Sequence, residues 1–220
     1  MPSSVAHSVA VLAFHPDSGR PLLPNGTLDV AIAGAILADL TAAGRIDIAD
    51  NQVVVLESSP PGISGIDEAL AEITTSKPRS PEEWVWALTK PAALVRTTTV
   101  DEAVAQGDIV LDCRRVLGVF GSNRWFPRPH SWVARVSDAV HAALTGAHPS
   151  PDATVAMTVA VLDAAGILSK RFPAARRELV DVVKQSTAAN DAVAKAMEHI
   201  TSAALVAVLA ATTMTPTPSN

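Results

Sequence analysis

LDVAIAGAILADLTAAGRIDI (residues 28–48), NQVVVLES (51–58) and GIDEALAEI (65–73) follow one another early in the chain and decide its fold. The first segment has apolar residues at helical spacing, which predicts a helix with Thr27 as its N-cap and Gly44 at its C-terminal end. The alternating residues that come next, interrupted by an Asp-Asn turn, predict a β-hairpin. The third segment predicts a second helix, over about 64–72.

The flanking segments extend this helical pattern in both directions. Residues 5–14 fit a helix or a strand equally well, and His15 to Gly19 is typical of a turn. The motif Ser80-Pro81-Glu82-Glu83 predicts a helix start, because it combines a capping Ser, a first-turn Pro and an acid three residues after the cap. The remaining predicted elements are helices over 92–106, 131–144, 152–168, 174–186 and 189–212, a second hairpin with strands 109–111 and 116–120 around a turn at 112–115, and a disordered tail over 213–220.

The composition favours a helical protein from a reducing compartment. Of the 220 residues, 48% are hydrophobic, many of them Ala, and only 4% are aromatic, which suits helices that approach through small side chains. The net charge of -5 argues against a general nucleic-acid binder, and a single cysteine excludes an intrachain disulfide. The N-terminus lacks the features of a signal peptide, and the longest apolar run, 203–211, is too short to span a bilayer. We therefore expect a cytoplasmic chain in which this run is a buried helix.

The residue patterns give little support to enzymatic activity. The six histidines show no metal-binding spacing, no GxSxG nucleophile motif occurs, and the glycines form no phosphate loop. Cys113 lies beside two arginines that could activate it, but a buried, inert thiol is the favoured interpretation. Adjacent acids such as Glu82 and Glu83 fit the first turn of a helix. We expect no catalytic residue, no metal and no cofactor.

One local cluster opposes the acidic average. It combines basic and aromatic side chains: Arg114, Arg115, Arg124, Arg128, Arg135, Trp125, Phe126 and Trp132. Arginine binds phosphate in a bidentate manner and tryptophan favours the boundary between apolar and wet surroundings, so the cluster could contact an anionic lipid surface. The alternative is that the tryptophans anchor the core while the arginines solvate its rim. A second basic group fits the polar face and end of a helix: Lys170, Arg171, Arg176 and Arg177.

Several segments, taken in order, resemble the Golgi phosphoprotein 3 family. Their Ala-rich composition resembles that of its bacterial members. They are SGRPLLPNGTLDVAIAGAILADLTAAGRIDI, VVVLES, GIDEALAEI, SPEEWVWAL, VLGVF and PDATVAMTVAVLDAAGIL, and the likeness runs from about residue 9 to 211. The resemblance implies a mainly α fold, in which an apolar helical bundle core is surrounded by amphipathic helices, with one or two small β-hairpins. It also implies a single domain over 1–212, followed by the tail 213–220.

For function, the resemblance implies peripheral membrane binding without catalysis. Eukaryotic members bind phosphatidylinositol 4-phosphate on Golgi membranes and retain glycosyltransferases by their tails. Their headgroup pocket uses a Trp before the first core helix, an Arg within that helix and basic residues on a helix after the second hairpin. In this sequence Pro24 and Ala33 stand at the first two positions, Arg135 matches a basic position, and Asp138 stands near the next one.

We therefore expect a peripheral membrane protein of the phosphoinositide-binding type that binds anionic phospholipid headgroups more loosely than the eukaryotic relatives do. The expected headgroup contacts are Arg124, Arg128, Arg135, Trp125 and Trp132. The resemblance also allows a protein partner and self-association, near 147–151 by analogy with the family; no nucleic acid is expected. The alternative is a protein-interaction or regulatory module with a winged-helix-like segment.

Overall fold

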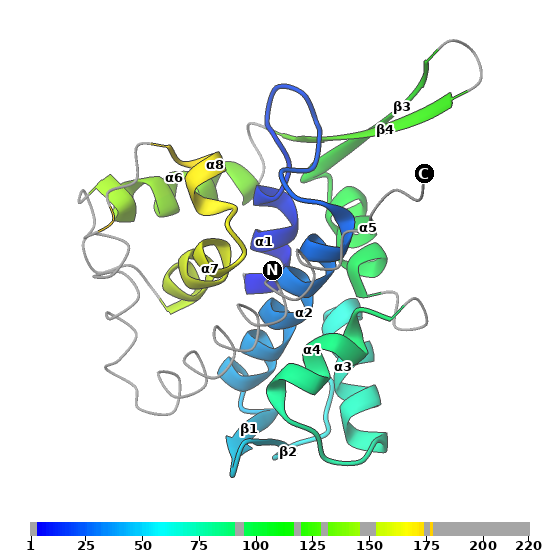
Figure 1. Ribbon diagram of the computed structural model, residues 1–220, viewed down its shortest axis with the longest axis vertical. Helices are drawn as coiled ribbons and strands as arrows, with labels where there is room; N and C mark the ends of the chain where they lie inside the picture. The colour runs from blue at the N-terminus through cyan, green and yellow to red at the C-terminus, as the bar shows by residue number, and fades with distance from the viewer. Residues whose placement is uncertain are drawn as a thin grey trace, which may run out of the picture.

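The computed structural model describes residues 4–90, 95–116, 120–128, 132–145, 153–173 and 177. Within these ranges the chain forms eight helices and two separate two-stranded antiparallel sheets (Figure 1). The elements, in chain order, are α1 (Val5–Leu12), α2 (Asn25–Ala42), β1 (Ile46–Ala49), β2 (Gln52–Val55), α3 (Ser64–Thr75), α4 (Pro81–Leu88), α5 (Val95–Ala105), β3 (Ile109–Val116), β4 (Phe120–Pro127), α6 (Trp132–Thr145), α7 (Ala153–Ala164) and α8 (Leu168–Arg171). The prediction of a mainly α fold with small hairpins is confirmed.

Helix α2 is the centre of the fold. It packs against α1, α3, α4, α5 and α7, and most of its residues from Thr27 to Leu40 are buried. Small side chains along it, such as Ala31, Gly34 and Ala38, let the surrounding helices approach closely. Because α2 is apolar nearly all round, it has no solvent-facing stripe, as expected of a helix at the core.

The N-terminal segment is a helix, which resolves the choice that the sequence left open. The Ser4 side chain caps α1 by accepting a hydrogen bond from the His7 N–H. The prediction of Thr27 as the N-cap of α2 is wrong, because α2 begins at Asn25 with Pro24 as its N-cap, and Thr27 is buried in the first turn. Proline fixes φ near the value found at the start of a helix. The helix therefore starts earlier than a cap at Thr27 predicts.

Helix α2 and the first hairpin end as the sequence predicts. Gly44 adopts a φ of +65°, and the N–H groups of Gly44 and Arg45 donate to the carbonyls of Thr41 and Leu40, which forms a Schellman cap. Asp50 and Asn51 both have positive φ, the conformation that a tight two-residue hairpin turn requires. The predicted capping box at Ser80 is confirmed as well, with Glu83 reciprocating.

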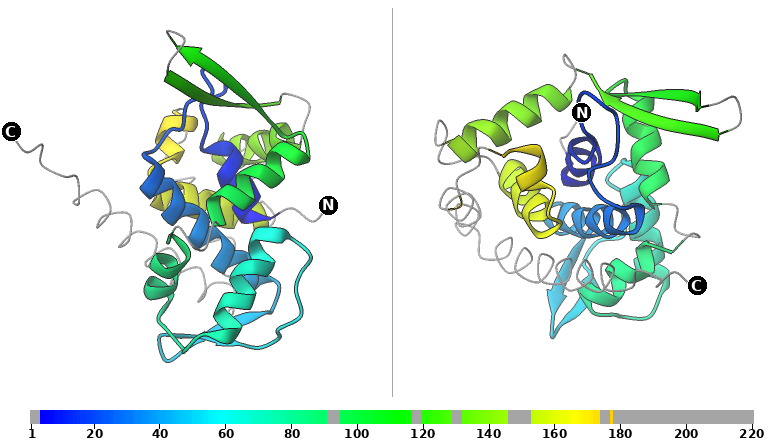
Figure 2. Two further views of the ribbon diagram at one scale, coloured as in Figure 1. Left: turned by 90° about the vertical axis from the view of Figure 1, so that its right-hand side faces the viewer. Right: turned by 45° about the horizontal axis from the view of Figure 1, so that its top comes forward.

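The second hairpin differs from its prediction. Residues 112–115 do not form the turn; they lie within β3, and the register pairs Asp112 with Arg124 and Leu111 with Trp125. Charged residues occupy consecutive positions of this strand, so the sequence lacks the alternation of apolar and polar residues by which a strand is predicted. The hairpin projects from the helical body (Figure 2), and Cys113 on β3 is exposed, which corrects the expectation of a buried thiol.

The helix predicted over 152–168 is interrupted. Helix α7 ends at Ala164, Gly166 turns the chain with a φ of +70°, and α8 follows. The helices predicted over 174–186 and 189–212, the tail 213–220 and the stretch 147–151 lie outside the described residues, apart from 177. In the part of the chain that the structure describes, no helix is both long enough and apolar enough to cross a bilayer.

A candidate anion-binding surface

The site is built on the loop of residues 15–22, which connects α1 to α2. This loop 15–22 closes on itself, since the His15 N–H donates to the Arg20 carbonyl (2.9 Å) and the Gly19 N–H donates to the His15 carbonyl (2.9 Å). The Leu22 N–H then donates to the Ala13 carbonyl (2.8 Å), which returns the chain to the body. The loop is therefore an ordered platform at one end of the molecule.

Strand β4 is fastened to this platform. The Trp125 N–H donates to the Gly19 carbonyl (2.9 Å), and the Trp125 ring stacks on Phe14 with centroids 5.3 Å apart. Gly19 has a φ of +60°, and a Cβ atom there would lie 3.0 Å from the Phe126 ring and 3.1 Å from the Arg124 Cβ. Gly19 is thus required both by its backbone conformation and by the close approach of β4.

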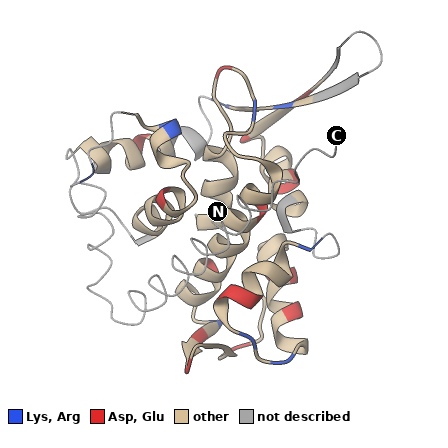
Figure 3. Cartoon of the chain, viewed as in Figure 1, with Lys and Arg blue, Asp and Glu red and all other residues tan. Residues whose placement is uncertain are grey.

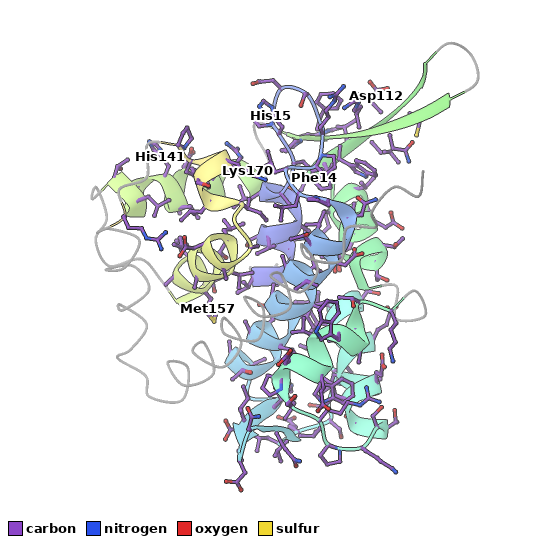
Figure 4. The ribbon with its side chains drawn as sticks, in the orientation of Figure 1. Phe14, His15, Asp112, His141, Met157 and Lys170 are labelled. Atoms are coloured by element: carbon purple, nitrogen blue, oxygen red, sulfur yellow. The ribbon has the colours of Figure 1, made fainter. Side chains whose placement is uncertain are left out.

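Basic residues of β4 and α8 lie against the loop, which carries one of its own. Arg20 belongs to the loop, and the Arg124 Cβ lies beside Gly19. Lys170, labelled in Figure 4, donates from Nζ to the Leu22 carbonyl (3.0 Å). Arg171, the next residue of α8, reaches α6, where its Nη2 lies 3.4 Å from the Ser137 Oγ. We call these four residues the basic face: Arg20, Arg124, Lys170 and Arg171.

Among the described residues, no carboxylate forms a close ion pair with the basic face, although Asp17 acts on Arg171 from farther away. Arg45 pairs with Glu57, Arg177 pairs with Asp163 at 3.4 Å, and Arg79 lies over the Trp84 ring. Figure 3 shows Lys and Arg on the loop, on β4 and on α8, with an acid on the same loop, while Asp and Glu lie on α3, α4 and β1 with further basic residues near them.

Acidic groups of the described residues near the basic face are few. Burial lowers the pKa of the Arg171 guanidinium, and Asp17 in the loop, whose side chain is 89% exposed, opposes this shift in part. Asp138 on α6 is exposed, and Asp112 stands opposite Arg124 in the hairpin register. None of the four cations is neutralised by a buried acid in the described part of the chain.

The structure brings together only part of the predicted headgroup cluster. Arg124 and Trp125 lie side by side on β4, where Trp125 packs on Phe14 at the edge of the core. Arg128 is exposed just after β4, and its N–H donates to the Asp108 carbonyl (2.9 Å). Trp132 and Arg135 belong to α6, but their side chains lie outside the described residues.

Sequence reasoning missed three residues of the basic face. Arg20 sits in a turn, and Lys170 and Arg171 were interpreted as the polar end of a helix. The first two positions matched to the family's headgroup pocket are not polar here, since Pro24 is the N-cap of α2 and Ala33 is fully buried. The signal that could have found Lys170 and Arg171 is Gly166, which separates them from α7.

Two further buried groups serve the framework. The His7 Nε2 lies 3.0 Å from the Asp108 Oδ2, which ties α1 to the base of β3. Asp39 accepts hydrogen bonds from the N–H groups of Val5 and Ala6 at the start of α1. No group of three metal-ligating side chains occurs among the residues described.

Comparison with known proteins agrees with the resemblance in the sequence. A family model described as Golgi phosphoprotein 3 (GPP34) matches residues 5–200, which is most of the chain. A search among curated proteins gives no significant match. The match covers α1 to α8, including the loop 15–22 and both hairpins. The chain belongs to the Golgi phosphoprotein 3 family.

Proposed function

We propose that this chain is a non-catalytic, peripheral protein that binds anionic phospholipid headgroups through the basic face. The observation that carries the proposal is that Arg20 lies in the ordered loop 15–22, the Arg124 Cβ packs beside Gly19 and Lys170 binds the Leu22 carbonyl, on a protein whose net charge is -5. An acidic protein would be repelled by an anionic surface unless it presented such a face toward it. Family membership supports a lipid- or protein-binding role in general and no known enzyme activity.

Electrostatic attraction sets the expected strength of binding to an anionic membrane. A basic residue near an anionic membrane contributes about 1 kcal/mol, and the attraction decays within a Debye length, about 8 Å at physiological ionic strength. Four such residues suffice for reversible binding that weakens steeply with salt. Because Pro24 and Ala33 replace the Trp and Arg of the family's headgroup pocket, we propose looser headgroup selection than in the eukaryotic relatives and a cytoplasmic, membrane-peripheral location.

Co-sedimentation with vesicles tests the proposal. We expect the protein to pellet with vesicles of phosphatidylcholine and phosphatidylglycerol at low salt, and to remain in solution with phosphatidylcholine alone. The double variant Arg20→Ala/Arg124→Ala should lose most of this binding. Its matched control is Lys77→Ala/Lys90→Ala, which removes the same charge from exposed residues near the ends of α3 and α4.

Two results would overturn the proposal. One is a protein that stays in solution with anionic vesicles at low salt. The other is an equal loss of binding in the double variant and in its control, which would show that net charge alone matters.

A role for Arg128, Arg135, Trp125 and Trp132 is tested by the quadruple alanine variant, whose fold is checked by circular dichroism.

A further inference from the structure

Strand β3 pairs with β4 along one edge only. The register of the two strands runs without a bulge over eight residue pairs, so their backbone groups point alternately toward and away from the partner strand. The Arg128 N–H donates to the Asp108 carbonyl (2.9 Å) across the hairpin, and the Trp125 N–H points away from β3 to the Gly19 carbonyl (2.9 Å). Both bonds fix the same alternation. Beyond the base of the hairpin, the β3 residues whose backbone N–H and C=O groups point away from β4 are therefore Leu111, Cys113 and Arg115.

This outer edge of β3 is exposed. The hairpin projects from the helical body (Figure 2), Cys113 is exposed, and the apolar side chains of Val110 and Leu111 are 37% and 38% exposed. Among the described residues, no backbone hydrogen bond reaches Leu111 or Cys113 from outside the hairpin, whereas the loop 15–22 bonds to the edge of β4. A strand edge with unpaired backbone groups and exposed apolar residues is a template for a further strand.

The sequence of β3 is complementary to itself in one antiparallel register. A two-fold axis at Cys113 places Asp112 of each copy opposite Arg114 of the other, and Val110 opposite Val116. Opposite charges directly across two strands are stabilising, and like charges there are destabilising. Moving the axis by one residue places Asp112 opposite itself or Arg114 opposite itself. The register centred on Cys113 is thus favoured by charge, and it gains the same charge pair twice.

We propose that the outer edge of β3 is a self-association surface, at which two copies of this chain pair β3 with β3 into one four-stranded antiparallel sheet centred on Cys113. The occupant is a second copy because the alternation of charge at Asp112 and Arg114 matches itself under two-fold symmetry. The surface is distinct from the stretch 147–151, and the inference is independent of lipid binding. Because one pair of short strands buries little area, we expect a weak, reversible dimer.

Sedimentation velocity of the full chain, in reductant and without vesicles, tests the proposal. We expect a monomer at low micromolar concentration that converts to a dimer as the concentration rises. Asp112→Arg and Arg114→Asp each place like charges opposite one another at two positions, so each variant should weaken self-association by about tenfold. An equimolar mixture of the two variants restores opposite charges at both positions and should dimerise as the wild type does.

A backbone variant tests the strand edge itself. Cys113→Pro removes an N–H that points away from β4, so the hairpin keeps its own ladder while the added strand loses a donor, and the dimer should be lost. The matched control is Asn123→Pro, at the residue directly opposite on β4, where the N–H also points out of the hairpin. This control should still dimerise. Circular dichroism verifies that both variants are folded.

The β3 interface is contradicted by any of three results. A chain that stays monomeric at every concentration excludes self-association. A dimer that is unchanged in Asp112→Arg and Arg114→Asp, or that is lost equally in the two proline variants, shows that the outer edge of β3 is not the contact. A mixture of the two charge variants that stays monomeric contradicts the register centred on Cys113, on which the proposal depends.

Discussion

Asp39 joins the first two helices through its carboxylate. Its Oδ1 accepts from the Val5 N–H (2.7 Å) and its Oδ2 from the Ala6 N–H (2.9 Å), so a side chain of α2 satisfies the free amides at the start of α1. Burial raises the pKa of Asp39 to about 7, against the opposing effect of these hydrogen bonds and of one from Ser4. The carboxyl group therefore couples helix packing to pH.

Replacing Asp39 by Ala should lower the free energy of unfolding by about 2 kcal/mol, because two buried N–H groups lose their acceptor. The folded-state pKa lies above the ordinary value of 3.8, so the folded protein holds this proton more tightly than the unfolded chain does. The stabilisation that the protonated Asp39 carboxyl group contributes to the folded state is complete below about pH 4 and is lost as the pH rises through 7. Urea unfolding at pH 5 and pH 8 should show a larger gap between wild type and Asp39→Ala at pH 5; a larger gap at pH 8 contradicts the raised pKa.

Gly19→Ala should destabilise the protein by about 1–2 kcal/mol through its left-handed backbone, and further through the 3.0 Å approach to Phe126. The matched control is Gly62→Ala, which has a φ of +86° but no atom within 4 Å of the added Cβ. Urea unfolding of both variants separates the two effects. Equal losses in the two variants would mean that the crowding against β4 costs nothing.

At the scale of elements, the sequence predicts structure where local chemistry decides it. The Gly44 cap, the Asp50-Asn51 turn and the Ser80 capping box are set by residues adjacent in sequence, and all three are confirmed. The extent of β3 depends instead on another part of the chain. The pairing of β4 along the charged residues of β3 is a contact between two segments, which the local pattern of β3 does not contain.

The capping box of α4 gives a prediction at this scale. Ser80→Ala removes the acceptor for the Glu83 N–H (3.2 Å) and should cost about 1 kcal/mol of stability. Ser58→Ala, an exposed loop serine, is the control and should be neutral. The measurement is the shift of the urea midpoint at unchanged slope, and equal midpoints for the two variants would show that the helix start is held by packing alone.

For the whole molecule, the distribution of charge matters more than its sum. The sequence reveals a cluster of arginines and tryptophans but cannot show that Trp125 turns onto Phe14 or that α8 returns to the loop 15–22. Lys170 and Leu22 are 148 positions apart, so their contact is set by the packing of α7 and α8 and not by spacing along the chain. The family can be inferred from the order of the sequence segments. The basic face can be identified only from the folded structure, because its residues are far apart in sequence.

Asp17 is the acid most exposed beside the basic face, and removing its charge should strengthen binding to anionic vesicles. We expect Asp17→Asn to raise the affinity by up to about fivefold at low salt, with the gain disappearing at high salt. Asp50→Asn changes the charge equally at the far hairpin, where Asn tolerates the positive φ of 50°. An identical gain from both variants would indicate a response to net charge and not to the face.

The exposed thiol of Cys113 has a practical consequence. Cys113 is the single cysteine of the chain and lies on β3 next to Asp112, opposite Asn123. A maleimide spin label therefore attaches to the unmodified protein at one known position, and its spectrum reports how the second hairpin moves relative to the helices during vesicle binding. The same thiol can join two chains covalently in aerobic buffer, so a reductant is needed before any measurement of self-association is read as a property of the fold.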